Sequence, residues 1–186
     1  MPEGVVGRIC RGAGPDTHGP NLVGDVGDDG RVTPAVRYLD ECGIAYRLCE
    51  YHHVDGRTDF GLEAAESLGI EPDRVLKTLV VLADNTEACA VVPVSSRLSL
   101  RALAAALGSR RAEMCPPDRA QRVTGYVVGG ISPIAQKRAL TVLVDETAQI
   151  FDEVLVSGGR RGLDIALAPD DLIRATAGRF ADIAQF

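Results

Sequence analysis

The stretch VLKTLVVLADNTEACAVVPV, residues 75–94, decides the fold class of this 186-residue chain. Two apolar runs, 75–83 and 87–94, flank the polar triplet DNT at 84–86. Val-rich runs of this length favour strands, and Asp and Asn tolerate the backbone of a tight turn. The pattern therefore predicts a β-hairpin near the middle of the chain.

Residues on both sides of the hairpin predict further helices and strands. Capping residues, apolar spacing and glycine stops predict helices at 33–42, 60–68, 99–107, 116–123 and 168–176. Short apolar runs predict strands at 44–51, 112–115, the first half of 125–138, 140–145, 153–156 and 163–167, with a helical turn at 147–151. Strands outnumber helices, and most adjoin through hairpins. We therefore expect an α+β fold with a mixed, largely antiparallel, barrel-like sheet flanked by helices.

The composition indicates one folded domain. The chain is 46% apolar but only 4% aromatic, so its core must consist mainly of Val, Leu, Ile and Ala. Residues 1–30 contain eight glycines and no periodic pattern, which predicts a flexible extension at 1–32 and a single domain at 33–186. No segment has the roughly 18 apolar residues of a membrane span, and no apolar leader is evident, so we expect no membrane partner.

Cysteine and histidine usage excludes several classes of site. The five cysteines are odd in number and never spaced C-x-x-C, and there are three histidines. This pattern argues against a disulfide framework and a zinc site, so we expect a cytoplasmic protein without metal or cofactor. Walker A and G-x-S-x-G sequences are also absent from the chain. Two alternatives stay open for the thiols: a nucleophile at Cys115, or at Cys49 beside His53, and a buried structural role.

The charge pattern leaves two interpretations open. A net charge of −6 excludes a bulk nucleic-acid coat, because such proteins carry a basic excess. Three basic pairs nevertheless lie near turns, at 110–111, 137–138 and 160–161. If they share one face they could hold a phosphodiester end, and if they are scattered they are ordinary solvated charges.

Lysine is rare, which draws attention to Lys77. Only Lys77 and Lys137 are lysines among the twenty basic residues. Lys77 lies inside the apolar run 75–83, where a charge is costly unless it faces a cleft or finds a partner. The alternative is a side chain that reaches solvent at a strand edge.

The stretch GYVVGGISPIAQKR, residues 125–138, combines backbone freedom with polarity. Its three glycines allow main-chain angles forbidden to other residues, and Pro133 removes one amide donor. Such a loop can offer N–H groups to a carbonyl or a phosphate. It can equally be a tight bend between a strand and a loop, without any ligand.

Several separate motifs together resemble the YbaK family, free-standing homologues of the editing domain inserted in bacterial prolyl-tRNA synthetases. The resemblance covers roughly 33–184 and implies the YbaK/ProRS-associated domain fold. The motifs that carry it are TPAV at 33–36, Tyr51, TDFG at 58–61, VLKTL at 75–79, TGYVVGGISP at 124–133 and VSGGRRGLD at 156–164.

The resemblance implies an aminoacyl-tRNA deacylase that hydrolyses mischarged Cys-tRNA(Pro) in trans. In such a reaction the thiol of the substrate attacks its own ester, and the protein supplies orientation and hydrogen-bond donors. The family's motifs place catalytic roles at Lys77, Gly129 and Asp164, and substrate binding at Tyr51, Phe60, Thr78, Gly130, Ser132, Ser157 and Gly158. Within this set we assign Lys77 to the terminal adenosine and the backbone at 129–130 to the carbonyl.

The expected partners are a tRNA 3′ end carrying a mischarged amino acid and prolyl-tRNA synthetase. Two other functions stay open from the sequence. One is an editing enzyme for another mischarged tRNA, such as Ala-tRNA(Pro). The other is a non-catalytic module that binds tRNA or a synthetase.

Overall fold

The computed structural model describes residues 32–186, so the extension predicted at 1–32 lies outside the described residues save for Val32. The described helices are α1 (Pro34–Cys42), α2 (Phe60–Leu68), α3 (Leu100–Ala106), α4 (Pro117–Thr124) and α5 (Pro169–Thr176), with 3₁₀ turns η1 (Pro72–Arg74) and η2 (Glu146–Ile150). The strands are β1 (Arg47–Glu50), β2 (Val75–Ala83), β3 (Thr86–Pro93), β4 (Arg97–Leu98), β5 (Ala112–Met114), β6 (Thr141–Asp145), β7 (Val154–Arg160), β8 (Leu163–Leu167), β9 (Arg179–Ala181) and β10 (Ala184–Gln185). None of these helices is long and apolar enough to cross a membrane.

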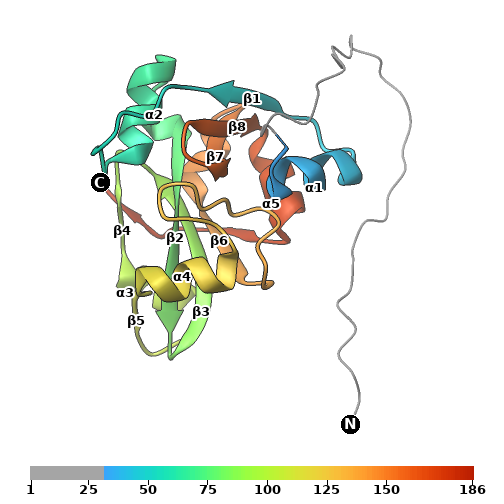
Figure 1. The fold of residues 1–186 in the computed structure, drawn as a ribbon. Helices are drawn as coiled ribbons and strands as arrows, with labels where there is room; N and C mark the ends of the chain where they lie inside the picture. The colour runs from blue at the N-terminus through green and yellow to red at the C-terminus, as the bar shows by residue number, and fades with distance from the viewer. Residues whose placement is uncertain (1–31) are drawn as a thin grey trace. The chain divides into compact units, whose positions relative to one another are not determined.

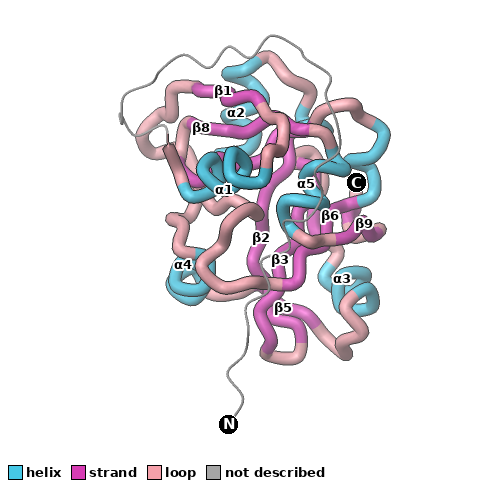
Figure 2. The backbone as a smooth tube through the Cα atoms, turned by 90° about the vertical axis from the view of Figure 1, so that its right-hand side faces the viewer, coloured by secondary structure: helices cyan, strands magenta, loops and turns pink. Residues whose placement is uncertain are grey.

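The central hairpin is confirmed and organises the sheet. β2 and β3 pair antiparallel from Leu76↔Pro93 to Ala83↔Thr86, and Asp84 and Asn85 take positive φ at the turn. The main sheet has the order β1-β8-β7-β2-β3-β6-β9, with β5 also paired to β2, and β4 pairs with β10 separately. The β2–β7, β3–β6 and β6–β9 ladders are parallel and the other five are antiparallel. This arrangement, with helices packed on the sheet, confirms the expected mixed α+β fold (Figures 1 and 2).

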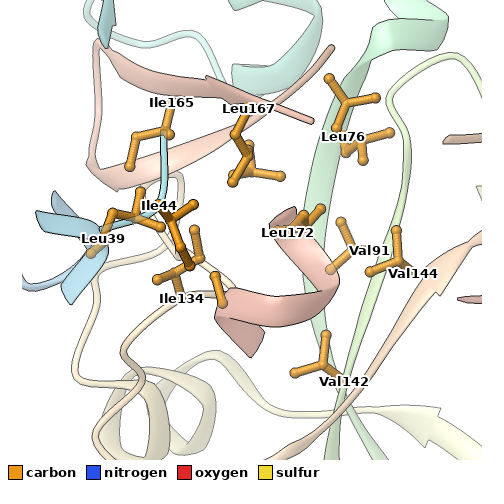
Figure 3. Packing of buried hydrophobic residues seen from close by; sticks show 14 of the residues in the cluster. Leu39, Ile44, Leu76, Val91, Ile134, Val142, Val144, Ile165, Leu167 and Leu172 are labelled. Atoms are coloured by element: carbon orange, nitrogen blue, oxygen red, sulfur yellow. The ribbon is translucent and has the colours of Figure 1, made fainter. Parts of the chain in front are cut away.

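Helices cover both faces of the sheet because successive β2 side chains point to opposite sides. Val75 packs in a cluster with Ala64 and Ala65 of α2, and Val81 packs in a cluster with Leu103 of α3. On the opposite face, the cluster around Leu76 includes Leu39 of α1, Leu172 of α5 and Ile134 from the loop between α4 and β6 (Figure 3). On the same face, Val80 packs with Val123 of α4. The sheet is therefore the middle layer, with α2 and α3 on one side and α1, α4 and α5 on the other.

One edge of β2 lacks a strand partner over four residues. The register with β7 ends at Leu76↔Val156, and the register with β5 begins at Val81↔Met114. A register shift between Ser157 and Arg160 marks a bulge in β7, and bulges bend a strand away from its neighbour. Residues 77–80 therefore have no strand partner on this edge, where, within residues 32–186, only the Val80 carbonyl accepts a main-chain hydrogen bond, from the Cys115 N–H; we call this edge the β2 window.

The sequence predictions fail mainly in the connecting segments. The strand expected in the first half of 125–138 is wrong, because these residues form a loop between α4 and β6. The Gly130 N–H closes a turn onto the Val127 carbonyl (2.9 Å), and Val127 is exposed instead of packed in a sheet. β7 runs on to Arg160, beyond the strand predicted at 153–156, and the short strands β4, β9 and β10 were not predicted.

The close contact between α2 and the end of β3 provides a test of the layer packing. A Cβ added at Gly61 would lie 2.3 Å from Val94 Cγ1, and a Val side chain has little rotamer freedom to move aside. We expect Gly61→Ala to lower the free energy of unfolding by about 1–3 kcal/mol, despite the higher helix propensity of Ala. Chemical denaturation measures this change.

The double variant Gly61→Ala/Val94→Ala is the control, because it removes the methyl group that the new Cβ would meet. The two changes should then couple favourably in a double-mutant cycle. A Gly61→Ala variant as stable as the native chain would contradict the close packing.

Candidate functional site

The β2 window opens into a pocket of about 460 Å³. Its walls come from β2, the start of α2, the β7–β8 pair, the loop at 128–131, and the segment from the end of β5 into α4. The lining brings together seven residues that the sequence predicts for the site, namely Tyr51, Phe60, Lys77, Thr78, Gly129, Ser157 and Asp164. The cavity therefore combines predicted site residues from the segment after β1, the start of α2, β2, the loop at 128–131 and the β7–β8 pair.

Lys77 is half-buried on the face of the sheet that carries α2 and α3. Its Nζ donates to the Ser96 carbonyl (2.5 Å) and lies 3.5 Å from the Val94 carbonyl. Desolvation lowers the pKa of Lys77, and the nearby Arg97 charge lowers this pKa further. Main-chain carbonyls thus position the amine at the pocket wall, and no carboxylate pairs with it within residues 32–186.

Thr78 points to the opposite face from Lys77, and both reach the pocket because it wraps around the unpaired edge. Thr78 Oγ1 is buried and has no hydrogen-bond partner among residues 32–186. Cys115 N–H donates to the Val80 carbonyl (3.0 Å), so the main chain of alternate residues, Thr78 included, faces the gap between β7 and β5. Buried polar atoms are rarely left unsatisfied, and this hydroxyl is therefore a candidate ligand contact.

Asp164 forms the inner wall beside Ser157. The two residues are paired across β7 and β8, and Asp164 is also paired with Cys49 of β1. Asp164 is only 6% exposed, and burial raises its pKa from the usual 3.8 to about 7. No side-chain hydrogen bond holds this carboxyl group in the described part of the chain, so it is available to a bound molecule.

Gly129 and Phe60 form the outer wall. Gly129 has φ +87°, and an added Cβ there would lie 2.7 Å from the Phe60 ring. Only glycine accepts both this backbone angle and this contact. The Gly129 N–H has no hydrogen-bond partner among residues 32–186, whereas the Gly130 N–H donates to Val127.

Arg161 connects three of these segments, and sequence reasoning did not assign it to the site. Its guanidinium lies 5.0 Å from the centre of the Phe60 ring. Its Nε and Nη2 donate to the Val128 carbonyl at 3.1 and 2.9 Å. The turn between β7 and β8 is thereby tied to α2 and to the glycine loop. The basic pair at 160–161, inside the motif at 156–164, was the only signal for it.

Three predicted residues lie outside the pocket lining. An added Cβ at Gly130 would lie 2.8 Å from Arg160 Cα, so this residue packs against the β7–β8 turn. Ser132 is fully buried, and its Oγ accepts from the Ile134 N–H at 3.2 Å. The Gly158 carbonyl accepts from Thr33 Oγ1 at 2.5 Å. These residues support the walls from behind.

The geometry does not favour a protein thiol as nucleophile. Cys115 lines the pocket, but it is buried, and desolvation raises its pKa. Burial likewise raises the pKa of Cys49. No histidine lines the pocket in the part of the chain that the structure describes. His53 Nδ1 instead lies 2.7 Å from a carboxylate oxygen of the buried Glu63. A thiolate would therefore find neither a lowered pKa nor a histidine base in the pocket.

The burial of Asp164 predicts a pH-dependent stability. Its pKa is raised to about 7 in the folded chain, so between about pH 4 and pH 7 the folded state holds a proton that the unfolded state has lost. The contribution of Asp164 to stability therefore falls as the pH rises through this range. Asn cannot ionise, so Asp164→Asn should gain stability relative to the native chain over the same range, by on the order of 1–4 kcal/mol.

Chemical denaturation across this pH range measures the effect, with the exposed Asp55→Asn as the control. A stability difference between Asp164→Asn and the native chain that stays constant with pH would show that the buried carboxyl group is already ionised.

A family model described as the aminoacyl-tRNA editing domain matches residues 61–175. A protein of Enterococcus faecalis, EbsC, named as a candidate Cys-tRNA(Pro)/Cys-tRNA(Cys) deacylase, is 37% identical over 153 residues, which is 81% of this chain and 92% of that protein. The crystal structure of the hypothetical protein APE2540 has a TM-score of 0.74 at 25% identity and covers 82% of this chain and 100% of its own.

A further crystal structure, of a candidate trans-editing enzyme for prolyl-tRNA synthetase, has a TM-score of 0.72 at 23% identity. It covers 83% of this chain and 99% of its own, and at this identity it supports the fold alone. The family match spans the β2 window, the glycine loop and Asp164, which are the parts that build the pocket. The chain belongs to the aminoacyl-tRNA editing domain family.

Proposed function

We propose that this protein is an aminoacyl-tRNA deacylase that hydrolyses mischarged Cys-tRNA(Pro) in trans. The observation that carries the proposal is a pocket with orienting and donor groups but no activated nucleophile. Lys77, Thr78 and Gly129 surround it, while its thiol, Cys115, is buried and has a raised pKa. The name of the relative EbsC specifies cysteinyl esters, which supports the choice of amino acid. We place the activity in the cytoplasm, where aminoacyl-tRNA is made and used.

A cysteinyl ester can supply the missing nucleophile itself. Its sulfur attacks the ester carbonyl carbon, the S–C bond forms, and the bond from that carbon to the ribose 3′-oxygen breaks. The thiol proton ends on the 3′-oxygen, and water then opens the resulting thiolactone to free cysteine. The protein must hold the thiol against the carbonyl, and such orientation contributes on the order of 7–11 kcal/mol in the best intramolecular cases.

The pocket groups fit distinct parts of this substrate. Lys77 Nζ, placed by the Ser96 and Val94 carbonyls, is the cation for the phosphate or sugar of the terminal adenosine. The free Gly129 N–H is a donor for the oxyanion that develops on the ester carbonyl, as are Thr78 Oγ1 and the main chain at the window. The Asp164 carboxyl group, at the inner wall, faces the α-amino group and ionises when that ammonium binds.

The tRNA identity is decided outside this pocket. Nothing in the lining distinguishes one tRNA from another, because every tRNA ends in the same terminal adenosine. EbsC carries both tRNA(Pro) and tRNA(Cys) in its name, which agrees with a pocket that recognises the cysteinyl group. Association with prolyl-tRNA synthetase would then direct the protein to Cys-tRNA(Pro) before the mischarged product escapes.

The two lysines provide a matched test of the site. We expect Lys77→Ala to lower kcat/KM for Cys-tRNA(Pro) deacylation by on the order of 10²-fold or more, because an oriented charge in the pocket is lost. Lys137→Ala removes the other lysine, which is exposed, and should leave the rate within about twofold, as for surface positions away from a site. Full deacylation by Lys77→Ala would refute the assigned site.

The dependence on the substrate thiol separates this function from its alternatives. Alanyl and cysteinyl side chains differ by one sulfur, and discrimination by binding alone would give only about 10–200-fold. If the thiol is the nucleophile, alanyl-tRNA(Pro) should bind without reacting, and the rate ratio should exceed this range. Cys115→Ala should retain the deacylation of Cys-tRNA(Pro).

Equal turnover of alanyl and cysteinyl esters would indicate an editing enzyme that does not use the substrate thiol. Binding of both without any turnover would indicate a non-catalytic module. Loss of activity in Cys115→Ala, with unchanged stability, would indicate that the nucleophile is the thiol of Cys115 and not that of the substrate.

A further inference from the structure

A second hollow lies on the α3 side of the sheet, separate from the pocket at the β2 window. It has a volume of about 440 Å³ and lies between α3 and the start of β5. Ala104 of α3 and Ala112 of β5 contribute small apolar side chains to it, and Arg101, Arg110 and Arg111 line it as well. All three arginines are exposed. A hollow lined by three guanidinium groups is a potential anion site.

These arginines differ from most others among residues 32–186 because none of them forms a salt bridge, although the charges of Arg110 and Arg111 are close enough to Asp84 to help lower the pKa of its carboxyl group. Arg47, Arg57, Arg74, Arg119, Arg138, Arg160 and Arg174 each pair with a carboxylate. In the described residues, Arg101, Arg110 and Arg111 form no ion pair. In a chain with a net charge of −6, three unpaired guanidinium groups around one hollow form a local basic patch.

Hydrogen bonds to Asp84 hold the main chain of Arg110 and Arg111 in place. The main-chain N–H groups of Arg110 and Arg111 donate to the two carboxylate oxygens of Asp84, at 2.9 and 3.3 Å. The Arg111 carbonyl accepts from the Asp84 N–H at 3.1 Å. The turn of the central hairpin therefore fixes the segment that carries both arginines, while their guanidinium groups form no ion pair within residues 32–186.

Cationic side chains without an ion-pair partner among residues 32–186 lie between this hollow and the pocket at the β2 window. Lys77 stands at the pocket wall, and Arg97 is close enough to act on its charge. Arg97, in β4, is exposed and forms no ion pair within residues 32–186, and Arg101 follows four residues later in the first turn of α3. On β5, Ala112 lines the hollow and Met114 lines the pocket. These two side chains share one face of the strand and lie about 7 Å apart along it.

We propose that Lys77, Arg97, Arg101, Arg110 and Arg111 form a track that binds the phosphodiester backbone of the tRNA acceptor end, with its 3′ terminus in the pocket at the window. A row of separated cations suits a polyanion with one charge per nucleotide better than a single phosphate. The continuity of the row with the deacylation pocket favours the substrate tRNA as the occupant. This assignment rests on the proposed function.

Binding of uncharged tRNA tests the track without relying on catalysis. The double variant Arg110→Gln/Arg111→Gln removes two charges while the Asp84 main-chain contacts can persist. We expect it to weaken tRNA binding several-fold at low salt, in fluorescence anisotropy. We also expect the slope of log K against log salt concentration to become shallower by about 1–2, since each lost phosphate contact contributes about 0.7–0.9.

The control is Arg37→Gln/Arg174→Gln, which removes two exposed arginines from α1 and α5 on the other side of the sheet. If both double variants weakened tRNA binding equally, the effect would come from net charge alone and the proposed track would be wrong. Unchanged tRNA binding by Arg110→Gln/Arg111→Gln would also contradict it. Loss of binding to prolyl-tRNA synthetase with tRNA affinity intact would also overturn it, because the surface would then contact protein. If the native chain binds tRNA through the track but deacylates nothing, the proposed function fails and the track stands.

Discussion

The unpaired edge of β2 is the constraint on which the rest of the site depends. β7 leaves this strand after Leu76 and β5 joins it at Val81, so residues 77–80 of a central strand have no strand partner on one side, and the Cys115 N–H reaches only the Val80 carbonyl there. In a continuous sheet these positions would be sealed by a ladder. Here the gap admits a ligand from both faces, and it lets Lys77 and Thr78 serve one pocket although their side chains leave the sheet in opposite directions. The bulge in β7 and the short β5 together create the opening.

Contacts within the protein itself hold the walls around this opening in place. Arg161 joins Phe60 to the Val128 carbonyl, and Gly129 lies against the Phe60 ring with a backbone that only glycine adopts readily. Asp164 is held in a β-ladder on both sides. Such a site provides orientation and hydrogen-bond donors in place of a nucleophile. A site of this kind suits a substrate whose own side chain supplies the nucleophile while the protein orients it.

The sequence predicted the elements with strong local signals. The β2–β3 hairpin followed from two apolar runs and a DNT turn, and α1 and α2 followed from a capping residue and a glycine stop. The loop at 125–138 was mistaken in part for a strand because its apolar residues, Val127 and Val128, resemble a strand although they are exposed. The seven predicted residues that meet in the pocket came from motif resemblance. Arg161 was missed because its role depends on contacts with Phe60 and Val128, which are distant in sequence.

The most direct measurement of the central claim is the NMR response of backbone amides to a non-hydrolysable, amide-linked cysteinyl-adenosine. If the β2 window receives the 3′ end of the substrate, the largest shifts fall on the Thr78 and Gly129 amides, and the amides of Ser157 and Asp164 respond as well. Amides at the distant edge strand β9 should be unaffected. Shifts concentrated away from residues 77–80, with the Thr78 amide unchanged at saturation, would contradict the claim that this edge is the substrate site.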